Sequence, residues 1–118
     1  MTSMSSLKAS RELSSRIRLL NDNFRSTFLG GRVVMSAGVA ELPIDIKARL
    51  LLRVQKFSTF NVKNDPHGEH DFGSFTVTGQ KFFWKIDYYD LQCEFGSEDP
   101  ADPAKTTRAL TIMLAEEY

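Results

Sequence analysis

The stretch that decides the fold is residues 72–89, FGSFTVTGQKFFWKIDYY. Aromatic and β-branched residues dominate it, and Gly79-Gln80 suits a tight turn because glycine tolerates a positive φ. Residues 72–78 and 81–88 are therefore predicted to pair as an antiparallel hairpin, with residues 91–95 as a third strand. A sheet built from these strands needs helices to bury one of its faces.

Alternation along residues 81–89 divides the middle strand into two unlike faces, because successive side chains of a strand point in opposite directions. The apolar face holds Phe82, Trp84, Ile86 and Tyr88. The other face mixes aromatic and charged side chains, which fits either partial cover by a helix or a recognition surface. Its members are Lys81, Phe83, Lys85, Asp87 and Tyr89.

Helices are predicted before and after these strands. The first begins near Arg11, where apolar residues recur every three or four positions and form one stripe. The second follows Pro43 and ends near Phe57, and its predicted apolar face includes Leu50 and Val54. The third follows Pro103 and runs to the chain end. With a short strand at residues 32–36, the order is α-β-α-β-β-β-α. This predicts an α+β fold in which three helices pack on a small, mostly antiparallel sheet.

Length and composition are those of an ordinary soluble protein. The 118 residues include 15 Lys+Arg and 15 Asp+Glu, and 42% are hydrophobic. Residues 1–10 are small and polar and are predicted to be a disordered tail, with residues 11–118 forming a single domain. The lone Cys93 makes no internal disulfide, and neither a secretory signal nor a membrane-spanning run is found. A cytoplasmic location without membrane contact is therefore expected.

The zero net charge conceals a strong division along the chain. Residues 1–63 hold 11 Lys+Arg against 4 Asp+Glu, a net charge of +7, and residues 64–118 hold 4 against 11, a net charge of −7. Either the two halves fold onto each other and neutralise locally, or they remain as two oppositely charged surfaces. The balanced total disfavours a general nucleic-acid binder without excluding nucleic acid at one patch.

The densest polar segment is NDPHGEHDFG, residues 64–73, which holds both histidines. In an extended segment His67, Glu69 and Asp71 point to one side, with His70 opposite. Imidazole and carboxylate groups are ligands for zinc, manganese or iron, so a divalent-metal site at His67, Glu69, His70 and Asp71 is one interpretation, and with it a small metal-dependent hydrolytic enzyme. A structural or recognition loop and acid–base catalysis by a histidine with a carboxylate are the others.

Arg11, Arg18 and Arg25 recur at intervals of seven and form a basic stripe beside the apolar face of the first helix. This stripe suits phosphates, which would make the protein a DNA-contacting regulator, or it suits acidic groups of the chain itself. Glu116 and Glu117, at the expected end of a helix where anions are disfavoured, are the acidic groups predicted to meet it.

No nucleophilic constellation is found. The chain has no G-x-S-x-G elbow, and Cys93 alternates with Leu91 and Phe95 as a buried strand residue would. The leading interpretation is a small non-enzymatic protein that inhibits or regulates a protein partner without a cofactor, because an acidic and aromatic surface suits a groove built for nucleic acid on a larger complex. The residues predicted to bind the partner are Asp65, His67, Glu69, His70, Asp71, Lys85, Asp87, Tyr89 and Asp90.

Four segments resemble a family of small alphaproteobacterial proteins of unknown function. They are GGRVVMSAGV, NDPHGEHDFG, FWKIDYYD and FGSEDPADPAKTTRALTIMLAEEY, and the resemblance extends from about Arg16 to Tyr118. It implies no activity, cofactor or catalytic residue. Members are often found on plasmids and other mobile regions, which implies a role in the contest of such an element with its host. The resulting expectation is an anti-defence, anti-CRISPR-like inhibitor that binds a host defence complex.

Overall fold

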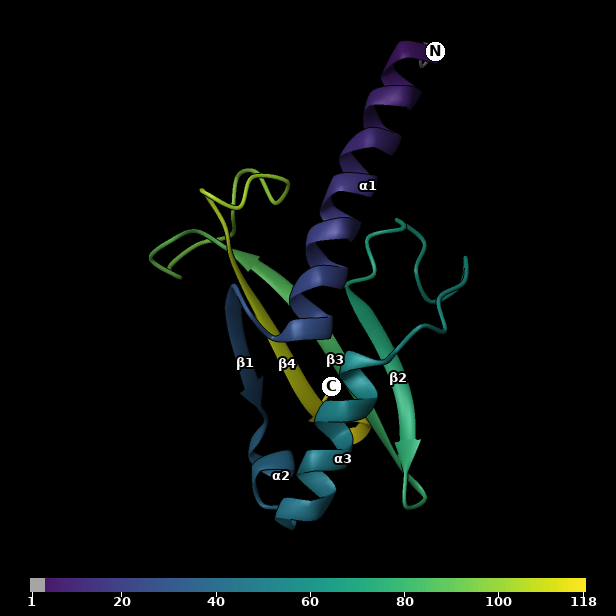
Figure 1. Ribbon diagram of the computed structural model, residues 1–118, viewed down its shortest axis with the longest axis vertical. Coiled ribbons are helices and arrows are strands. Elements are labelled where there is room, and N and C mark those ends of the chain that lie inside the picture. The colour runs from purple at the N-terminus through teal and green to yellow at the C-terminus, as the bar shows by residue number, and fades with distance from the viewer. Residues whose placement is uncertain (1–3) are drawn as a thin grey trace.

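The computed structural model describes residues 4–118 and shows three helices beside a four-stranded sheet (Figure 1). In chain order the elements are α1 (Met4–Thr27), β1 (Gly31–Met35), α2 (Ala37–Ala40), α3 (Ile44–Gln55), β2 (Phe72–Val77), β3 (Gln80–Tyr89), β4 (Thr107–Leu114) and a final 3₁₀ turn, η1 (Ala115–Glu117). The strands lie in the order β1-β4-β3-β2, with β1 parallel to β4 and the other neighbours antiparallel. The predicted α+β class and mostly antiparallel sheet are confirmed.

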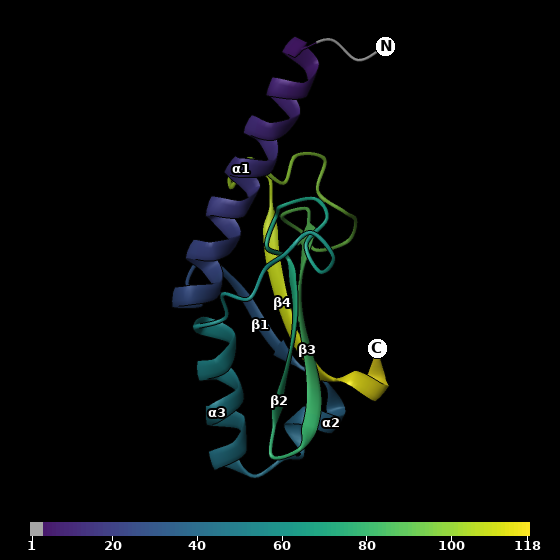
Figure 2. The same ribbon diagram turned by 90° about the vertical axis from the view of Figure 1, so that its right-hand side faces the viewer.

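Helices α1 and α3 cover one face of the sheet (Figure 2). On that face the alternate residues Phe82, Trp84 and Ile86 of β3 are buried, as their spacing predicts. Leu50 and Val54 of α3 are completely buried in the same core, which confirms the predicted apolar face of this helix. Burying an aliphatic or aromatic side chain of this size contributes about 1.5–3 kcal/mol to stability.

Helix α1 begins at Met4 rather than near Arg11, so residues 4–10 of the predicted disordered tail are helical, and residues 1–3 of that tail lie outside the described residues. The helix continues this far because residues 4–10 contain neither proline nor glycine. Residues 4–13 are exposed and project beyond the sheet in both views (Figures 1 and 2). No helix within residues 4–118 is long and apolar enough to cross a membrane.

Strands β2 and β3 form the predicted hairpin, with its two-residue turn at Thr78-Gly79 rather than at Gly79-Gln80. Thr78 and Gly79 have positive φ values of 51° and 78°, as in the turn type whose twist matches that of paired strands. The register pairs Val77 with Gln80, so the hairpin closes one residue earlier than predicted.

The C-terminal segment predicted as a helix is the strand β4. Its apolar residues fit two periods at once: Leu110, Met113 and Leu114 have helical spacing, whereas Leu110 and Ile112 have strand spacing and are completely buried. The strand is the stable choice because β4 lies between β1 and β3, where its backbone groups are bonded on both edges.

Residues 91–95, predicted as a third strand of the meander, form a loop between β3 and β4 instead. The chain turns after Tyr89 because Asp90 Oδ1 accepts a hydrogen bond of 3.0 Å from the Glu94 N–H. Cys93 is half-buried in this loop, with a φ of 58° that no strand residue adopts, so the prediction that it alternates as a buried strand residue is wrong.

Glu117 ends the short 3₁₀ turn η1 and caps α2 instead of lying at the end of the predicted α-helix. Its Oε1 accepts hydrogen bonds from Ser36 Oγ and the Leu114 N–H, and its Oε2 accepts one of 3.0 Å from the Gly38 N–H. These bonds, that of Ser36 above all, lower the pKa of the Glu117 carboxyl. The predicted pairing of Glu116 and Glu117 with the arginine stripe is therefore wrong, because the C-terminus lies beside α2.

Candidate functional site

The loop at residues 61–71 lies against α1, where Asn21 is the centre of a buried polar network. Asn21 Nδ2 donates to the Glu69 carbonyl oxygen at 2.9 Å and to Tyr88 Oη at 2.8 Å, and its Oδ1 accepts from Arg108 Nε at 2.7 Å. Tyr88 Oη in turn donates to Glu69 Oε1 at 2.8 Å. Asn21 was missed in the sequence analysis. Its spacing from Ile17 and Phe24, four and three residues, places it on the buried side of α1, where a polar side chain needs a hydrogen-bond partner.

Two titratable groups of this network are shifted toward their neutral forms. Burial lowers the pKa of the Arg108 guanidinium and raises the pKa of the Tyr88 phenol. Arg108 nevertheless keeps two acceptors, because its Nη2 also donates to the Pro100 carbonyl oxygen at 2.5 Å. The network therefore ties α1, the 61–71 loop and the sheet together through satisfied hydrogen bonds.

His70 lies between two carboxylates. Its Nδ1 is 2.8 Å from Asp22 Oδ1, and its Nε2 is 3.5 Å from Asp65 Oδ2. The ring stacks on Phe60 with the two centroids 3.7 Å apart, and the His70 N–H donates to Asp65 Oδ1 at 3.1 Å. Both ring nitrogens and one ring face are thus occupied by the chain itself, so His70 and Asp65 connect the loop to α1.

The predicted ligands at residues 67–71 do not converge. Positive φ values of 67° at Gly68 and 53° at His70 break the alternation that would have placed three of them on one side. His67 is exposed, and burial together with the charge of Glu69 raises the pKa of Asp71. Within residues 4–118 no group of three His, Cys, Asp or Glu side chains is arranged to hold a metal ion.

The three arginines of the predicted basic stripe have different environments. Arg11 is exposed, whereas Arg18 donates to the Gly68 carbonyl oxygen at 3.0 Å and to Ser15 Oγ at 3.1 Å. Arg25 is buried, with 5% of its surface exposed. The stripe is therefore not one continuous surface facing a ligand.

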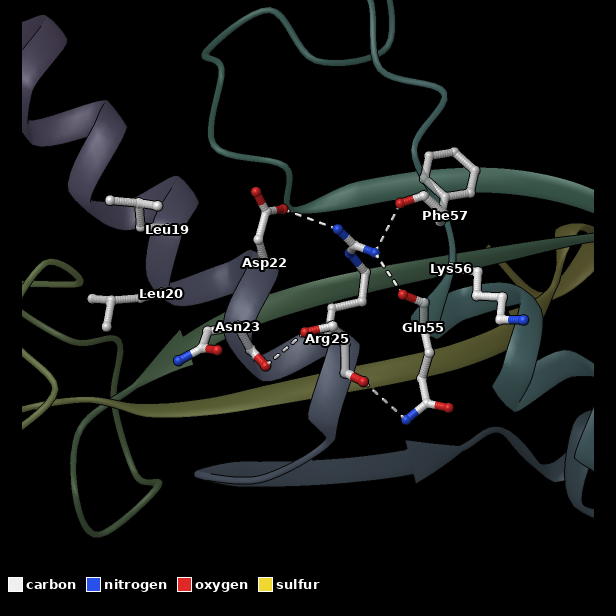
Figure 3. A pocket seen from close by; sticks show the side chains of 9 residues that line it. Leu19, Leu20, Asp22, Asn23, Arg25, Gln55, Lys56 and Phe57 are labelled. Atoms are coloured by element: carbon white, nitrogen blue, oxygen red, sulfur yellow. Dashed lines mark hydrogen bonds and ion pairs between the residues drawn. The ribbon is translucent and has the colours of Figure 1, made fainter.

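Arg25 caps the C-terminal end of α3 (Figure 3). Its Nη1 donates to the carbonyl oxygens of Val54, Gln55 and Phe57 at 3.2, 3.3 and 2.9 Å. Its Nη2 donates to Asp22 Oδ1 at 2.9 Å. Because the last carbonyls of a helix carry partial negative charge, they compensate a buried guanidinium and are themselves satisfied by it.

The opposite face of the sheet is covered by neither α1 nor α3 (Figure 2). As alternation predicts, Lys85, Asp87 and Tyr89 project from β3 on this side and are half-buried. Lys85 Nζ donates to Asp87 Oδ2 at 3.0 Å, which raises the pKa of Lys85. Two of the predicted partner-binding charges thus neutralise each other.

Residues 90–98, named here the acidic loop, have apolar side chains exposed between carboxylates. Leu91 and Phe95 are 56% and 72% exposed, and Glu94 and Glu98 are exposed beside them. The backbone is nevertheless held, because the Asp90 N–H donates to the Phe95 carbonyl oxygen at 2.8 Å. Sequence reasoning missed this exposure, since the alternation of residues 91, 93 and 95 resembled a buried strand.

The two oppositely charged halves of the sequence do not neutralise each other through ion pairs. Among residues 4–118, no ion pair joins a Lys or Arg of the first 63 residues to an Asp or Glu of the remainder. Helices α1 and α3 form one layer, and the acidic loop lies away from it (Figure 2). The acidic residues of the second half are themselves divided, because Asp65 and Glu69 belong to the loop against α1 and Glu94 and Glu98 to the acidic loop.

A comparison with known protein families finds one match, the family described as "Protein of unknown function (DUF3768)", over residues 35–117. The match begins at the end of β1 rather than near Arg16, so α1 lies outside it and the acidic loop lies inside. No curated protein and no solved structure matches the chain. The expected resemblance to a family of unknown function is confirmed: the chain belongs to the DUF3768 family.

Proposed function

We propose that this protein is a non-enzymatic binding protein that regulates or inhibits a protein partner by docking the acidic loop on it. The observation that supports this most is the exposure of Leu91 and Phe95, 56% and 72%, on a backbone fixed by hydrogen bonds. Single exposed apolar side chains are common on proteins. Two of them four residues apart, in a nine-residue loop with three carboxylates, have the composition of a binding anchor with a charged rim.

The charge of the acidic loop determines the kind of partner. The loop contains Asp90, Glu94 and Glu98 and no Lys or Arg, a net charge of −3, and Lys105 outside it lies 3.7 Å from Glu98 in an exposed ion pair. Such a surface fits a basic groove, for example one built for nucleic acid on a larger complex, and its rim charges raise the association rate. The resemblance to proteins of plasmids and other mobile regions favours a host defence complex as this partner, in an anti-CRISPR-like role.

The experiment captures partners of the intact chain from an alphaproteobacterial lysate and then measures the affinity of the purified partner by calorimetry. Phe95→Ser is expected to weaken binding about tenfold or more, because it removes the apolar anchor. Glu94→Lys is expected to weaken binding and to reduce its dependence on salt. The control is Ile44→Ser, which removes an even more exposed apolar side chain, 82% exposed, at the start of α3.

Two results would contradict the proposal. One is an affinity that Phe95→Ser and Ile44→Ser change equally, since the anchor would then have no special role. The other is a salt dependence that Glu94→Lys leaves unchanged, since the acidic loop would then lie outside the interface.

A further inference from the structure

A groove between α3 and the free edge of β2 has the composition of an anion-binding site. This α3–β2 groove has a volume of about 370 Å³. Its lining includes Arg53, Lys56, Ser58, Thr59, Ser74 and Phe75, and none of the described residues that line it is acidic. Hydrogen-bond donors and positive charge are thus concentrated there without a carboxylate to neutralise them.

Arg53 and Lys56 stand one helical turn apart at the end of α3. Arg53 Nη1 donates to the Thr76 carbonyl oxygen at 3.1 Å, and its guanidinium carbon lies 5.2 Å from the centroid of the Phe75 ring. These contacts hold the guanidinium at the sheet edge and leave its other N–H groups without an acceptor in the described chain. Lys56 Nζ makes no hydrogen bond or ion pair with residues 4–118 and is directed away from Arg25 in Figure 3.

The free edge of β2 adds neutral donors to the same groove. The Asp71 carbonyl oxygen accepts a hydrogen bond from β3, and bonded residues alternate along an antiparallel ladder, so the N–H of Ser74 faces away from β3. The Thr76 carbonyl, which accepts from α3, confirms this direction. Ser58 and Thr59 also line the groove and carry further hydroxyl groups, whereas Ser74 contributes its backbone N–H because its side chain is on the other face of the sheet.

The negative end of the α3 dipole does not oppose an anion at this position. The carbonyl oxygens of Val54, Gln55 and Phe57 already accept hydrogen bonds from Arg25, which is itself buried. The charge of Arg25 therefore offsets the partial charges of the helix end. The charges of Arg53 and Lys56 remain available to a ligand.

We propose that the α3–β2 groove binds a phosphate group carried by a small organic molecule. A phosphate monoester has three strong acceptor oxygens and, like a phosphorylated side chain, a charge of about −1.5 to −2 at neutral pH. This matches two cations and several neutral donors, whereas a single carboxylate would leave one cation unpaired. Phe57 and Phe75 provide an apolar wall for the organic part, and the volume lies near the lower end of small-ligand sites.

The test follows amide chemical shifts of the intact ¹⁵N-labelled protein during titration with phenyl phosphate at low ionic strength. Saturable binding is expected, with the largest shifts at Arg53, Lys56 and Ser74. Lys56→Gln is expected to weaken binding about tenfold through the loss of one charge-assisted contact. The control is Arg49→Gln, which removes an exposed charge of the same helix that does not line the groove. We expect it to change the affinity less than about twofold, because an exposed charge outside the site is screened by water and salt.

Three results would overturn the proposal. Equal weakening by Arg49→Gln and Lys56→Gln would indicate general attraction of anions to the helical layer. Inorganic phosphate that binds as tightly as phenyl phosphate would remove the assignment to an organic phosphate. Binding of duplex DNA without any binding of phenyl phosphate would favour a DNA-contacting surface instead. Because Lys56 is exposed and its side chain makes no hydrogen bond or ion pair within the described chain, Lys56→Gln is expected to stay folded even if Arg53→Gln does not.

Discussion

The loop at residues 61–71 and the acidic loop have similar polar composition and opposite environments. In the first, Asp65 bonds to His70 and Glu69 bonds to Tyr88. In the second, Glu94 and Glu98 are exposed, and Glu98 has only a solvent-exposed ion pair of 3.7 Å with Lys105. The difference follows from what packs nearby: α1 lies against the first loop and supplies Asn21, whereas the acidic loop lies away from α1 and α3 (Figure 2). A carboxylate-rich loop thus serves the fold or faces solvent according to its tertiary neighbour.

The largest effect is expected at Asn21, through which the loop at residues 61–71 is bonded to α1. Asn21→Ala removes the acceptor of Arg108 and the donor to Glu69, and should lower the free energy of unfolding by about 2–4 kcal/mol. Urea denaturation measures the change. Asn23→Ala, at an exposed position of the same helix, should stay within about 0.5 kcal/mol of the parent protein. A loss below about 1 kcal/mol for Asn21→Ala would show that the network contributes little to stability.

The second test asks whether α1 also holds α3. Arg25→Met removes the side-chain donor to the Gln55 and Phe57 carbonyl oxygens and the ion pair with Asp22, and a loss of about 2 kcal/mol is expected by the same urea measurement. Arg16→Met, on the exposed side of α1, is the matched control and should have almost no effect. If the two variants were equally stable, the capping of α3 by Arg25 would have no energetic importance.

The third test concerns an exposed carboxylate, that of Glu117, whose oxygens are nevertheless hydrogen-bonded within the fold. Glu117 is exposed, yet its lowered pKa reports hydrogen bonds to Ser36 and to backbone N–H groups. Its stabilising contribution is complete above the ordinary pKa of 4.5 and is lost as the pH falls through the lowered value. Glu117→Gln should therefore lower the Tm at neutral pH, by less than Arg25→Met does. The Tm difference between Glu117→Gln and the parent protein should shrink as the pH falls below 4.5. Glu116→Gln should change nothing, and a Glu117→Gln effect that persists at low pH would contradict a role for the charge.

The smallest stability effect is expected in the acidic loop. Phe95→Ser should change the free energy of unfolding by less than about 0.5 kcal/mol, because the side chain is 72% exposed. The same urea measurement decides. A loss above about 1 kcal/mol would place Phe95 in the fold and would remove the contrast between the two loops.

Local patterns predicted the centre of the fold correctly. The alternation of Phe82, Trp84 and Ile86 placed β3 in the sheet, and the stripe of Leu50 and Val54 identified the buried side of α3. Both patterns follow from backbone geometry, which repeats every two residues in a strand and every 3.6 in a helix. The same rule failed for β4, whose apolar residues satisfy both periods, because only its two neighbouring strands select one of them.

The candidate site was less accessible to such reasoning. Alternation correctly placed Lys85 and Asp87 on the face away from α1 and α3, but it did not show that they pair with each other. The spacing of seven placed Arg25 in a basic stripe beside the apolar face of α1, although its side chain is buried against α3 carbonyls from residues about thirty positions later. Short spacings do not report contacts of this range.

The sequence alone therefore determined the elements whose side chains repeat with one clear period, together with the division of charge between the two halves of the chain. Only the tertiary structure decided which polar groups form hydrogen bonds within the protein and which face solvent. Asn21 shows the reason: its hydrogen-bond partners Glu69, Tyr88 and Arg108 lie 48, 67 and 87 residues away along the chain. A buried polar group must find its partner in space, and no local pattern specifies a partner that distant.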